Sequence, residues 1–325
     1  MAEKLKVVVT DYEYASLHFE KEEMRKIGAD LVPCQCRNEE DLIANTRDAD
    51  GLFVQYARIT RRVMENLRQC KAIVVYGIGV DGIDVKAATD HGIMVMNVPD
   101  YGIQDVADHT IALLLAAARK IVTLNNSIKS GTWNFNLAKP LRRLEGKVLG
   151  LVAFGNIARV VALRARPFGF RIQVFDPYLN PGVAAQFGVT AVDLSTLFST
   201  SDFICLHAPL TDATRHLVNA ELLNRVKPSA ILINTARGGL VDEAALIEAL
   251  RSGRLAGAAL DVMEKEPANP DNPLLRMENV IITPHAAWYT EEGQDILQCK
   301  AARHMARALT GEIPENILNP ECLKR

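Results

Sequence analysis

The fold is decided by residues Lys147–Asp176, which read KVLGLVAFGNIARVVALRARPFGFRIQVFD. The apolar run Val148–Ala153 is typical of a strand buried on both faces, and from Asn156 onward apolar residues recur at helical spacing. Residues Arg171–Phe175 form a second expected strand, which ends at Asp176. This succession of strand, turn, helix and strand predicts an α/β fold with a parallel sheet.

The turn of this unit suits the pyrophosphate of a dinucleotide. The first amides of the helix and the helix dipole face the turn, so they attract negative charge. Asp176, about 20 residues further on, would accept hydrogen bonds from ribose hydroxyls and repel a 2′-phosphate, so NAD is favoured over NADP. An ordinary strand–turn–helix crossover would show the same hydrophobic pattern, so this motif alone leaves both interpretations open.

The turn departs from the usual G-x-G-x-x-G fingerprint. Ala153, Gly155 and Ala158 occupy the three glycine positions, so only the middle glycine is present. Alanine is an accepted variant at the third position. At the first position its Cβ is unfavourable, because the glycine expected there makes the tight turn. Whether Ala153 weakens NAD binding is therefore open. Pro167 should end or bend the last helical turn, because it lacks an amide hydrogen.

Length and composition indicate two domains and exclude several classes of function. A chain of 325 residues, 49% of them hydrophobic, can bury two cores. The 37 basic and 39 acidic residues are balanced and form no basic stripe, which argues against nucleic acid as a partner. Cys34 and Cys36 lack a matching pair at metal-ligand spacing, so we expect no metal and reduced thiols. The start shows no secretory pattern and the apolar runs are short, so we expect a cytoplasmic protein with no membrane partner.

The first hundred residues alternate short apolar runs with helix-compatible stretches, as in a parallel sheet wrapped by helices. We expect five strands there, at Lys6–Thr10, Leu31–Pro33, Gly51–Val54, Ala72–Tyr76 and Ile93–Met96. The glycine-rich stretch Gly77–Asp84 lies between the last two. It is either a turn whose aspartates cap the next helix or a loop whose amides receive an anionic substrate. The stretch taken alone favours the turn.

Two crossings between the domains are expected. The pattern breaks at Asn97–Gly102, before a long helix at Gln104–Lys120, and Thr290 caps a last helix that returns to the first domain. We therefore assign residues 1–99 plus 290–325 to a substrate domain and residues 100–289 to an NAD-binding domain. Residues 119–144 interrupt the alternation and are either a dimer arm or a surface excursion.

Three chemically matched residues follow successive strands of the second domain. Arg237 follows the strand that ends at Asn234, Glu266 follows Ala256–Val262, and His285 follows the strand that ends at Thr283. Parallel strands bind ligands at their carboxyl ends, so these side chains should meet at one edge.

Together these groups suit the reduction of a 2-oxo acid. Arginine can bind a carboxylate bidentately, histidine can give a proton to the developing alkoxide, and a glutamate can hold the imidazole. Each residue also has an ordinary explanation: Arg237 as a helix-capping cation, Glu266 as a solvent-facing residue, and His285 as a satisfied histidine at a strand end. The combination at one sheet edge favours the chemical interpretation.

The motifs around these residues resemble those of the D-isomer-specific 2-hydroxyacid dehydrogenases. They are NTARGGLVDE at Asn234–Glu243, A-L-D-V-x-x-x-E-P at Ala259–Pro267 and TPH at Thr283–His285. Within that family the chain is most similar to the C-terminal-binding-protein branch, through HAAWY at His285–Tyr289, DPYL at Asp176–Leu179 and T-G-x-I-P at Thr310–Pro314.

The resemblance implies two doubly wound parallel-sheet domains, a Rossmann-type nucleotide domain inserted into a flavodoxin-like substrate domain. It implies Arg237 as carboxylate binder, His285 as acid/base and Glu266 as its partner, with Glu264 as the competing carboxylate. It also implies a homodimer joined through the NAD-binding domains. The residues implied for NAD are Ala153, Phe154, Gly155, Asn156, Ile157, Ala158, Asp176, Ala208, Pro209, Thr214, Thr235, Ala236, Arg237, His285 and, at the carboxamide, Asp261.

For the substrate, the resemblance implies that the loop of Gly77, Ile78 and Gly79 receives the carboxylate, with Arg237 and His285. Trp288 is either an aromatic wall over the substrate or a packing residue. Tyr76, Tyr101 and Ile78 predict a less polar pocket, and the absence of an added Arg or Lys disfavours phosphoglycerate.

The leading hypothesis is an NAD-dependent oxidoreductase that interconverts a 2-oxo acid and a D-2-hydroxy acid. The alternative is an NAD(H)-sensing dimeric binding protein of the co-repressor type, with little turnover. The sequence leaves the physiological 2-hydroxy acid open.

Overall fold

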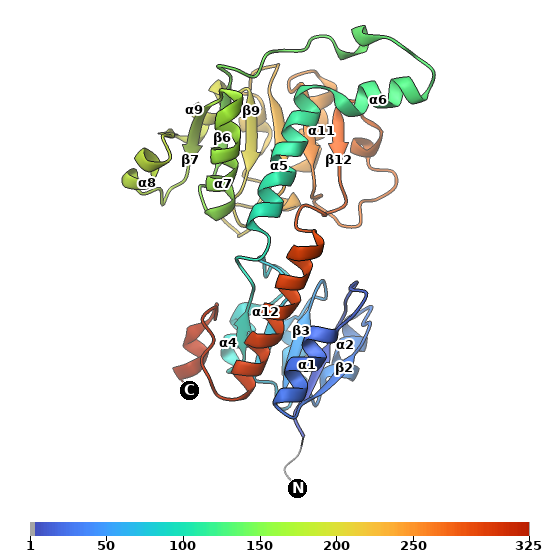
Figure 1. Ribbon diagram of the computed structural model, residues 1–325, viewed down its shortest axis with the longest axis vertical. Coiled ribbons are helices and arrows are strands. Elements are labelled where there is room, and N and C mark those ends of the chain that lie inside the picture. Colours follow the sequence, from blue (N-terminus) through green and yellow to red (C-terminus); the bar gives the residue numbers. More distant parts are fainter. Residues whose placement is uncertain (1–3, 325) are drawn as a thin grey trace. The chain divides into compact units, whose positions relative to one another are not determined.

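The computed structural model describes residues 4–324, which divide into two compact units (Figure 1). One unit comprises the chain up to Gly102 together with the chain from Thr290 onward, and the other is Ile103–Tyr289. The second unit is thus inserted into the first. The first crossing lies three residues beyond the predicted boundary at residue 99, and which ligand each unit binds stays a prediction.

The first unit is a five-stranded parallel sheet in the order β2-β1-β3-β4-β5, the flavodoxin-like order. All five expected strands are confirmed to within one residue. The strands are β1 (Lys6–Val9), β2 (Asp30–Pro33), β3 (Gly51–Val54), β4 (Ala72–Val75) and β5 (Met94–Met96). The helices are α1 (His18–Lys26), α2 (Glu39–Thr46), α3 (Arg61–Glu65), α4 (Val85–Asp90), α12 (Glu291–Leu309) and the 3-10 helix η5 (Pro320–Lys324). Thr290 caps α12 as expected, by accepting from the amide of Gly293.

The second unit is a seven-stranded parallel sheet in the order β12-β11-β10-β9-β6-β7-β8. Its strands are β6 (Val148–Val152), β7 (Arg171–Phe175), β8 (Thr190–Ala191), β9 (Phe203–Leu206), β10 (Ile231–Asn234), β11 (Gly257–Leu260) and β12 (Val280–Ile282). The winding reverses between β6 and β9, which is the Rossmann arrangement and places the ligand crevice beyond the carboxyl ends of these two strands.

Helices cover both faces of this sheet. They are α5 (Ile103–Ala118), α6 (Ile121–Lys129), α7 (Asn156–Ala165), α8 (Pro181–Gln186), α9 (Leu194–Thr200), α10 (Ala220–Leu223), α11 (Glu243–Arg251) and the 3-10 helices η1 (Phe135–Ala138), η2 (Arg166–Phe168), η3 (Gly238–Leu240) and η4 (Pro273–Arg276). Successive residues of β9 enter different cores: Phe203 packs with α5 and α7, and Ile204 packs with α9 and α11. Burial on both faces explains the continuous apolar runs in the sequence.

The sequence does not predict two elements of this unit. Helix α6 lies within residues 119–144, a stretch expected to be less regular, and it buries none of its residues. Figure 1 shows it continuing from the end of α5 away from the sheet. Strand β8 is a two-residue edge strand on β7. Both elements lack the buried apolar pattern from which an element is recognised.

Among residues 4–324, no single helix is both long and apolar enough to cross a membrane, and the pair α5 and α6 passes that test only as two helices bent by 63°. The same residues contain no cluster of three or more His, Cys, Asp or Glu side chains that could hold a metal ion.

A glutamate is fully buried in the first unit. Glu20 of α1 has no exposed surface; its carboxyl group accepts hydrogen bonds from Tyr76 Oη (2.9 Å) and from Gln298 Nε2 (3.1 and 3.3 Å). Burial raises the pKa of Glu20, and these hydrogen bonds only partly oppose that effect.

Glu20→Gln should therefore flatten the pH dependence of stability. Because the pKa of Glu20 lies above its unfolded value of 4.5, the folded protein binds more protons above pH 4.5, and the free energy of unfolding falls as the pH rises through the folded pKa. An amide cannot lose this proton. Urea denaturation of both proteins from acid to neutral pH measures the difference, and an equal fall in both would contradict the assignment.

Candidate functional site

The three predicted catalytic residues follow neighbouring strands of the second unit. β10 pairs with β11, and β11 with β12, so that Asn234, Leu260 and Ile282 lie side by side at the carboxyl edge of the sheet. Arg237 and His285 come shortly after the first and last of these strands, and Glu266 follows the middle strand. All three loops therefore begin at the same edge of the sheet.

His285 and Glu266 are in direct contact. His285 Nδ1 donates to Glu266 Oε2 at 2.7 Å, and the amide of Met263 donates to the other carboxylate oxygen at 2.8 Å. Burial alone would raise the pKa of Glu266, but the hydrogen bond and charge of His285, the Met263 amide and the charge of Arg237 together lower it. Glu266 is therefore an ionised and fixed partner, and it leaves Nε2 of His285 without a hydrogen bond to any described residue.

The loop of Arg237 runs directly against the loop of Glu266. A Cβ at Gly238 would lie 1.9 Å from the carbonyl oxygen of Met263, so only glycine permits this approach. The side chain of Asn234 accepts from the Ala236 amide (3.0 Å) and donates to the Arg237 carbonyl (2.9 Å). These contacts fix the backbone that carries the guanidinium near Glu266.

The loop of His285 is held by Asp261, a buried residue. The Asp261 carboxylate accepts from Thr283 Oγ1 (2.5 Å) and from the amides of Ala286 and Ala287 (both 2.9 Å). His285 itself has a φ of +54°, a conformation that residues other than glycine rarely adopt, and its amide donates to the Asp261 carbonyl at 2.8 Å. Asp261 thus positions the imidazole, and the expected contact of Asp261 with the nicotinamide carboxamide stays a prediction.

Helix α5 adds two polar residues to this edge that the sequence does not single out. His109 Nε2 lies 3.0 Å from Thr283 Oγ1 and 3.5 Å from Asp261, and Thr110 shares a 2.7 Å hydrogen bond with Thr235. Their only sequence signal is that they follow Asp108 as polar residues directly before the apolar run Ile111–Ala118.

The turn after β6 fits the pyrophosphate of NAD. Helix α7 follows Gly155 without a side-chain cap, and nothing lies within 4 Å of where a Cβ on Gly155 would stand, so an anion can approach the first amides of the helix. Asp176 accepts from the amides of Phe154 and Tyr178, each at 2.8 Å, and each of its oxygens keeps a lone pair for a ribose hydroxyl. Pro167 lies in η2, directly after α7 ends, as expected.

The alanine at the first fingerprint position is strained. Ala153 has a φ of +70°, which is the left-handed conformation that the tight turn requires and that glycine adopts without a steric cost. The departure from the fingerprint therefore affects the backbone of the turn itself.

The loop after β9 also borders the crevice. Thr214 Oγ1 donates to the Pro209 carbonyl at 2.6 Å and accepts from the Thr211 amide at 2.8 Å, so the loop that begins at Ala208 is closed on itself. His207 precedes this loop; burial lowers its pKa to about 4, and its Nε2 has no partner among the described residues. The imidazole of His207 is therefore neutral at neutral pH.

The glycine loop of the first unit keeps its amides open. The carbonyl of Gly77 accepts from the Val98 amide (2.9 Å) and that of Ile78 from Asn97 Nδ2 (2.6 Å), whereas the amides of Ile78 and Gly79 donate to no residue of the described chain. Asp84 also caps α4, as the turn interpretation expects, and the binding of a substrate by the open amides stays a prediction.

The expectation that Tyr76 lines a substrate pocket is wrong. Tyr76 is only 6% exposed, and its hydroxyl donates to Glu20 inside the first unit. Trp288 is partly buried and meets the ring of Tyr289 edge-on, with the ring centroids 5.7 Å apart.

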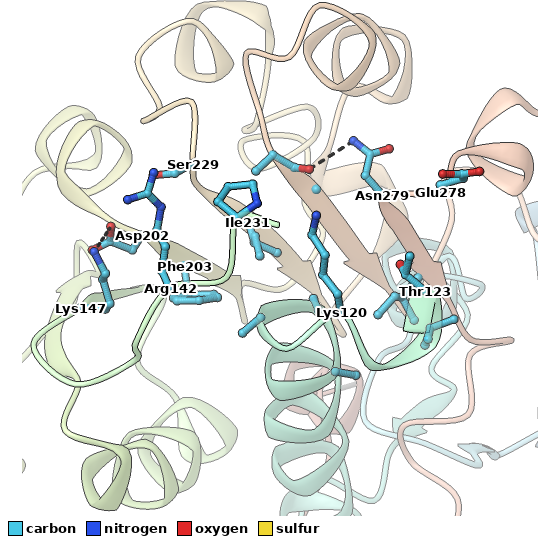
Figure 2. Close-up of a pocket in the computed structure, with 18 of the residues that line it drawn as sticks. Lys120, Thr123, Arg142, Lys147, Asp202, Phe203, Ser229, Ile231, Glu278 and Asn279 are labelled. Atoms are coloured by element: carbon cyan, nitrogen blue, oxygen red, sulfur yellow. Dashed lines mark hydrogen bonds and ion pairs between the residues drawn. The ribbon is translucent and has the colours of Figure 1, made fainter. Parts of the chain in front are cut away.

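A cavity of about 500 Å³ lies at the opposite edge of the second sheet (Figure 2). Its walls include the first residues of β9, β10 and β11, together with Lys120 and Arg142 from residues 119–144. Since Arg237, Glu266 and His285 all follow the carboxyl ends of strands, this cavity is separate from the candidate site.

Comparison with known proteins identifies the family. The model of the D-isomer specific 2-hydroxyacid dehydrogenase NAD binding domain matches residues 111–287. The chain belongs to the D-isomer-specific 2-hydroxyacid dehydrogenase family. The matched residues lie within the second unit, and NAD is the cofactor.

Relatives with this fold extend over nearly the whole chain. A D-3-phosphoglycerate dehydrogenase of Methanocaldococcus jannaschii is 42% identical over 97% of this chain, which spans 59% of that relative's length. A glyoxylate reductase of Korarchaeum cryptofilum is 40% identical over 87% of this chain and 86% of its own length. The crystal structure of a D-lactate dehydrogenase of Aquifex aeolicus, complexed with NAD and lactic acid, matches 96% of this chain and 99% of that chain with a TM-score of 0.87 at 27% identity. The similarity to the C-terminal-binding-protein branch stays a prediction.

Ala153→Gly is expected to raise the free energy of unfolding. A left-handed conformation costs an alanine roughly 1–2 kcal/mol, which the substitution removes. The greater conformational entropy of glycine in the unfolded chain offsets part of this stabilisation, so the net increase should be about 0.5–1 kcal/mol. Urea denaturation measures the change. The control is Ala162→Gly, within α7, which should lower stability by about 1 kcal/mol or more; a loss of stability in both variants would contradict the strain at Ala153.

Proposed function

We propose that this protein is an NAD-dependent dehydrogenase that interconverts a 2-oxo acid and a D-2-hydroxy acid. The observation that supports this most directly is the 2.7 Å hydrogen bond from His285 Nδ1 to the ionised Glu266, next to the loop of Arg237. A fixed imidazole with one ring nitrogen open is what a general acid/base requires.

Each residue of this set has one role in the proposed reaction. When bound, NADH would supply the hydride for reduction, and NAD⁺ would accept it in the reverse direction. Nε2 of His285 gives a proton to the carbonyl oxygen as it becomes a hydroxyl and takes that proton back during oxidation. Glu266 holds the ring through Nδ1, and the Arg237 guanidinium binds the carboxylate of the substrate and polarises its carbonyl.

For the first unit we propose that the open amides of Ile78 and Gly79 bind the substrate carboxylate. Trp288 is proposed as the apolar wall of the substrate. We favour short 2-oxo acids such as glyoxylate, because the loop has Ile78 between its glycines and the sequence offers no added cation for a phosphate. A panel of glyoxylate, pyruvate, hydroxypyruvate and phosphohydroxypyruvate, ranked by kcat/KM, tests this order; a preference for phosphohydroxypyruvate would overturn it.

His285→Ala is expected to lower kcat for glyoxylate reduction about 10²–10⁴-fold, because the proton donor is lost. The Kd for NADH should stay within about threefold, since the turn after β6 is untouched. NADH oxidation measures the first quantity and a fluorescence titration the second.

His216 offers a matched control for this experiment. Its Nε2 lies 2.8 Å from Glu264, and its φ of +52° is close to that of His285. The two pairs are similarly exposed, but His216 lies outside the set above. His216→Ala should leave kcat within about twofold of the native value. Equal losses in the two variants would refute the role of His285 and revive Glu264 as the functional carboxylate.

The alternative, an NAD(H)-sensing binding protein with little turnover, is not favoured. It offers no reason for an ionised glutamate held against a histidine at the strand edge, and the relatives compared above carry the names of enzymes. Tight NADH binding without turnover of any 2-oxo acid would instead support it.

We propose further that the protein is a cytoplasmic homodimer joined through residues 119–144 of the NAD-binding unit. Helix α6 buries none of its residues, and an exposed apolar stretch of this extent is typical of an interface. Large apolar side chains are exposed along the whole stretch: Ile121, Val122, Ile128, Trp133, Phe135, Leu137 and Leu141. The cavity in Figure 2, beside the base of this stretch, offers apolar walls to a second copy.

Changing Trp133 and Phe135, which are 90% and 73% exposed, to Asp should convert the dimer to a monomer, because the charges would be buried at the interface. Analytical ultracentrifugation measures the mass in solution. Tyr178→Asp, at a side chain that is 94% exposed in the same unit, should leave the dimer intact. A native protein that sediments as a monomer would contradict the proposal.

A further inference from the structure

The first unit contains a buried polar cluster that the proposed chemistry does not use. Its members are Glu20 on α1, Tyr76 directly after β4 and Gln298 on α12, which are 0%, 6% and 2% exposed. Helices α1 and α12 pack side by side, as Figure 1 shows, and α12 also packs on β4. One carboxyl group therefore joins a strand end to two helices that are far apart in the sequence.

Both oxygens of the Glu20 carboxyl group are hydrogen-bonded. Tyr76 Oη donates to one oxygen of Glu20 at 2.9 Å, and Gln298 Nε2 donates to both of its oxygens and also to the Ser16 carbonyl at 2.9 Å. Packing alone does not require a carboxyl group here, because an apolar side chain would fill the space without the cost of burying a polar one. The cluster thus specifies a geometry at some cost in stability.

The residue held in this way is the last one before the glycine loop. The Tyr76 ring lies against Phe53, with the centroids 5.4 Å apart at 15°, and meets Tyr14 edge-on at 5.1 Å. Gly77 follows with a φ of +156°, and backbone contacts hold the carbonyls of Gly77 and Ile78. The Tyr76 hydroxyl is therefore the side-chain anchor at the start of the segment whose amides are open.

We propose that Glu20, Tyr76 and Gln298 are positioning residues for substrate binding, which hold the amides of Ile78 and Gly79 in the orientation that receives the substrate carboxylate. The proposal rests on the proposed function, because it takes this loop as the carboxylate site. None of the three side chains touches the substrate; they act through the backbone of the loop.

Tyr76→Phe tests this directly, because it removes only the hydroxyl and keeps the ring between Phe53 and Tyr14. The KM for glyoxylate should rise about fivefold to tenfold, which corresponds to the loss of one hydrogen bond. The kcat should stay within about twofold and the Kd for NADH should not change, since His285 and the NAD turn lie in the other unit.

Tyr14→Phe is the matched control. Tyr14 is a buried tyrosine in the same aromatic cluster, but its hydroxyl has no hydrogen-bond partner among the described residues. This variant should leave the KM within about twofold of the native value. Glu20→Gln keeps an acceptor for the Tyr76 hydroxyl and should also stay near the native KM, whereas Glu20→Leu should reproduce the rise seen for Tyr76→Phe.

An unchanged KM in Tyr76→Phe, or an equal rise in Tyr14→Phe, would overturn the positioning role. Failure of the proposed function has a separate signature, which is that the native protein turns over no 2-oxo acid. In that case calorimetry compares the Kd for oxamate, with NADH present, in the same variants. An oxamate Kd that Tyr76→Phe leaves unchanged overturns the role, and the lack of oxamate binding by the native protein overturns both proposals.

Discussion

The buried carboxylate of Asp261 is the interaction on which the arrangement of the candidate site depends. Its two oxygens accept from Thr283, Ala286 and Ala287, so the chain turns sharply around it directly after β12. Its own amide donates to the Asn234 carbonyl and its carbonyl accepts from the His285 amide, both at 2.8 Å. One residue thus joins the ends of β10, β11 and β12. Removing it would leave one buried and two part-buried donors without this acceptor, which is more costly than losing one surface contact.

The first unit meets the same requirement with a different carboxylate. Asp11, two residues beyond the end of β1, accepts from the amides of Tyr56 (2.6 Å) and Ala57 (3.2 Å) in the loop after β3. The last residues of parallel strands leave amides that need acceptors, because the ladder ends there. In both units a carboxylate next to a strand end supplies them. The same sheet edges also hold the residues to which we assign chemistry. The hydrogen bonds that order these loops therefore also position the candidate site.

Much of the fold can be predicted from the sequence because each sheet is buried on both faces, which leaves continuous apolar runs such as Val148–Val152. The strand tips of the second unit place Arg237, Glu266 and His285 without further information, since neighbouring parallel strands end at one edge. Helix α6 could not be predicted in this way. It has no buried face, and periodicity signals burial rather than helix formation itself.

The side-chain network could not be predicted for a different reason. A tyrosine at a strand end looks the same in the sequence whether it faces a pocket, as expected for Tyr76, or bonds to Glu20 in the core. Thr110 likewise looks like any polar helix residue until Thr235 is placed against it. Such pairings depend on which faces of distant elements meet, and local pattern does not carry that information.

The discontinuous first unit has a consequence for biosynthesis. Ile103–Tyr289 is one contiguous segment and can fold as soon as it leaves the ribosome, but the sheet formed by the first hundred residues waits for α12, which is translated after that whole segment. Until then, Glu20 lacks Gln298, its partner 278 residues away. Before α12 is made, the nascent first unit thus exposes apolar surface that can bind chaperones or aggregate. A premature stop before Thr290 would leave that surface permanently exposed.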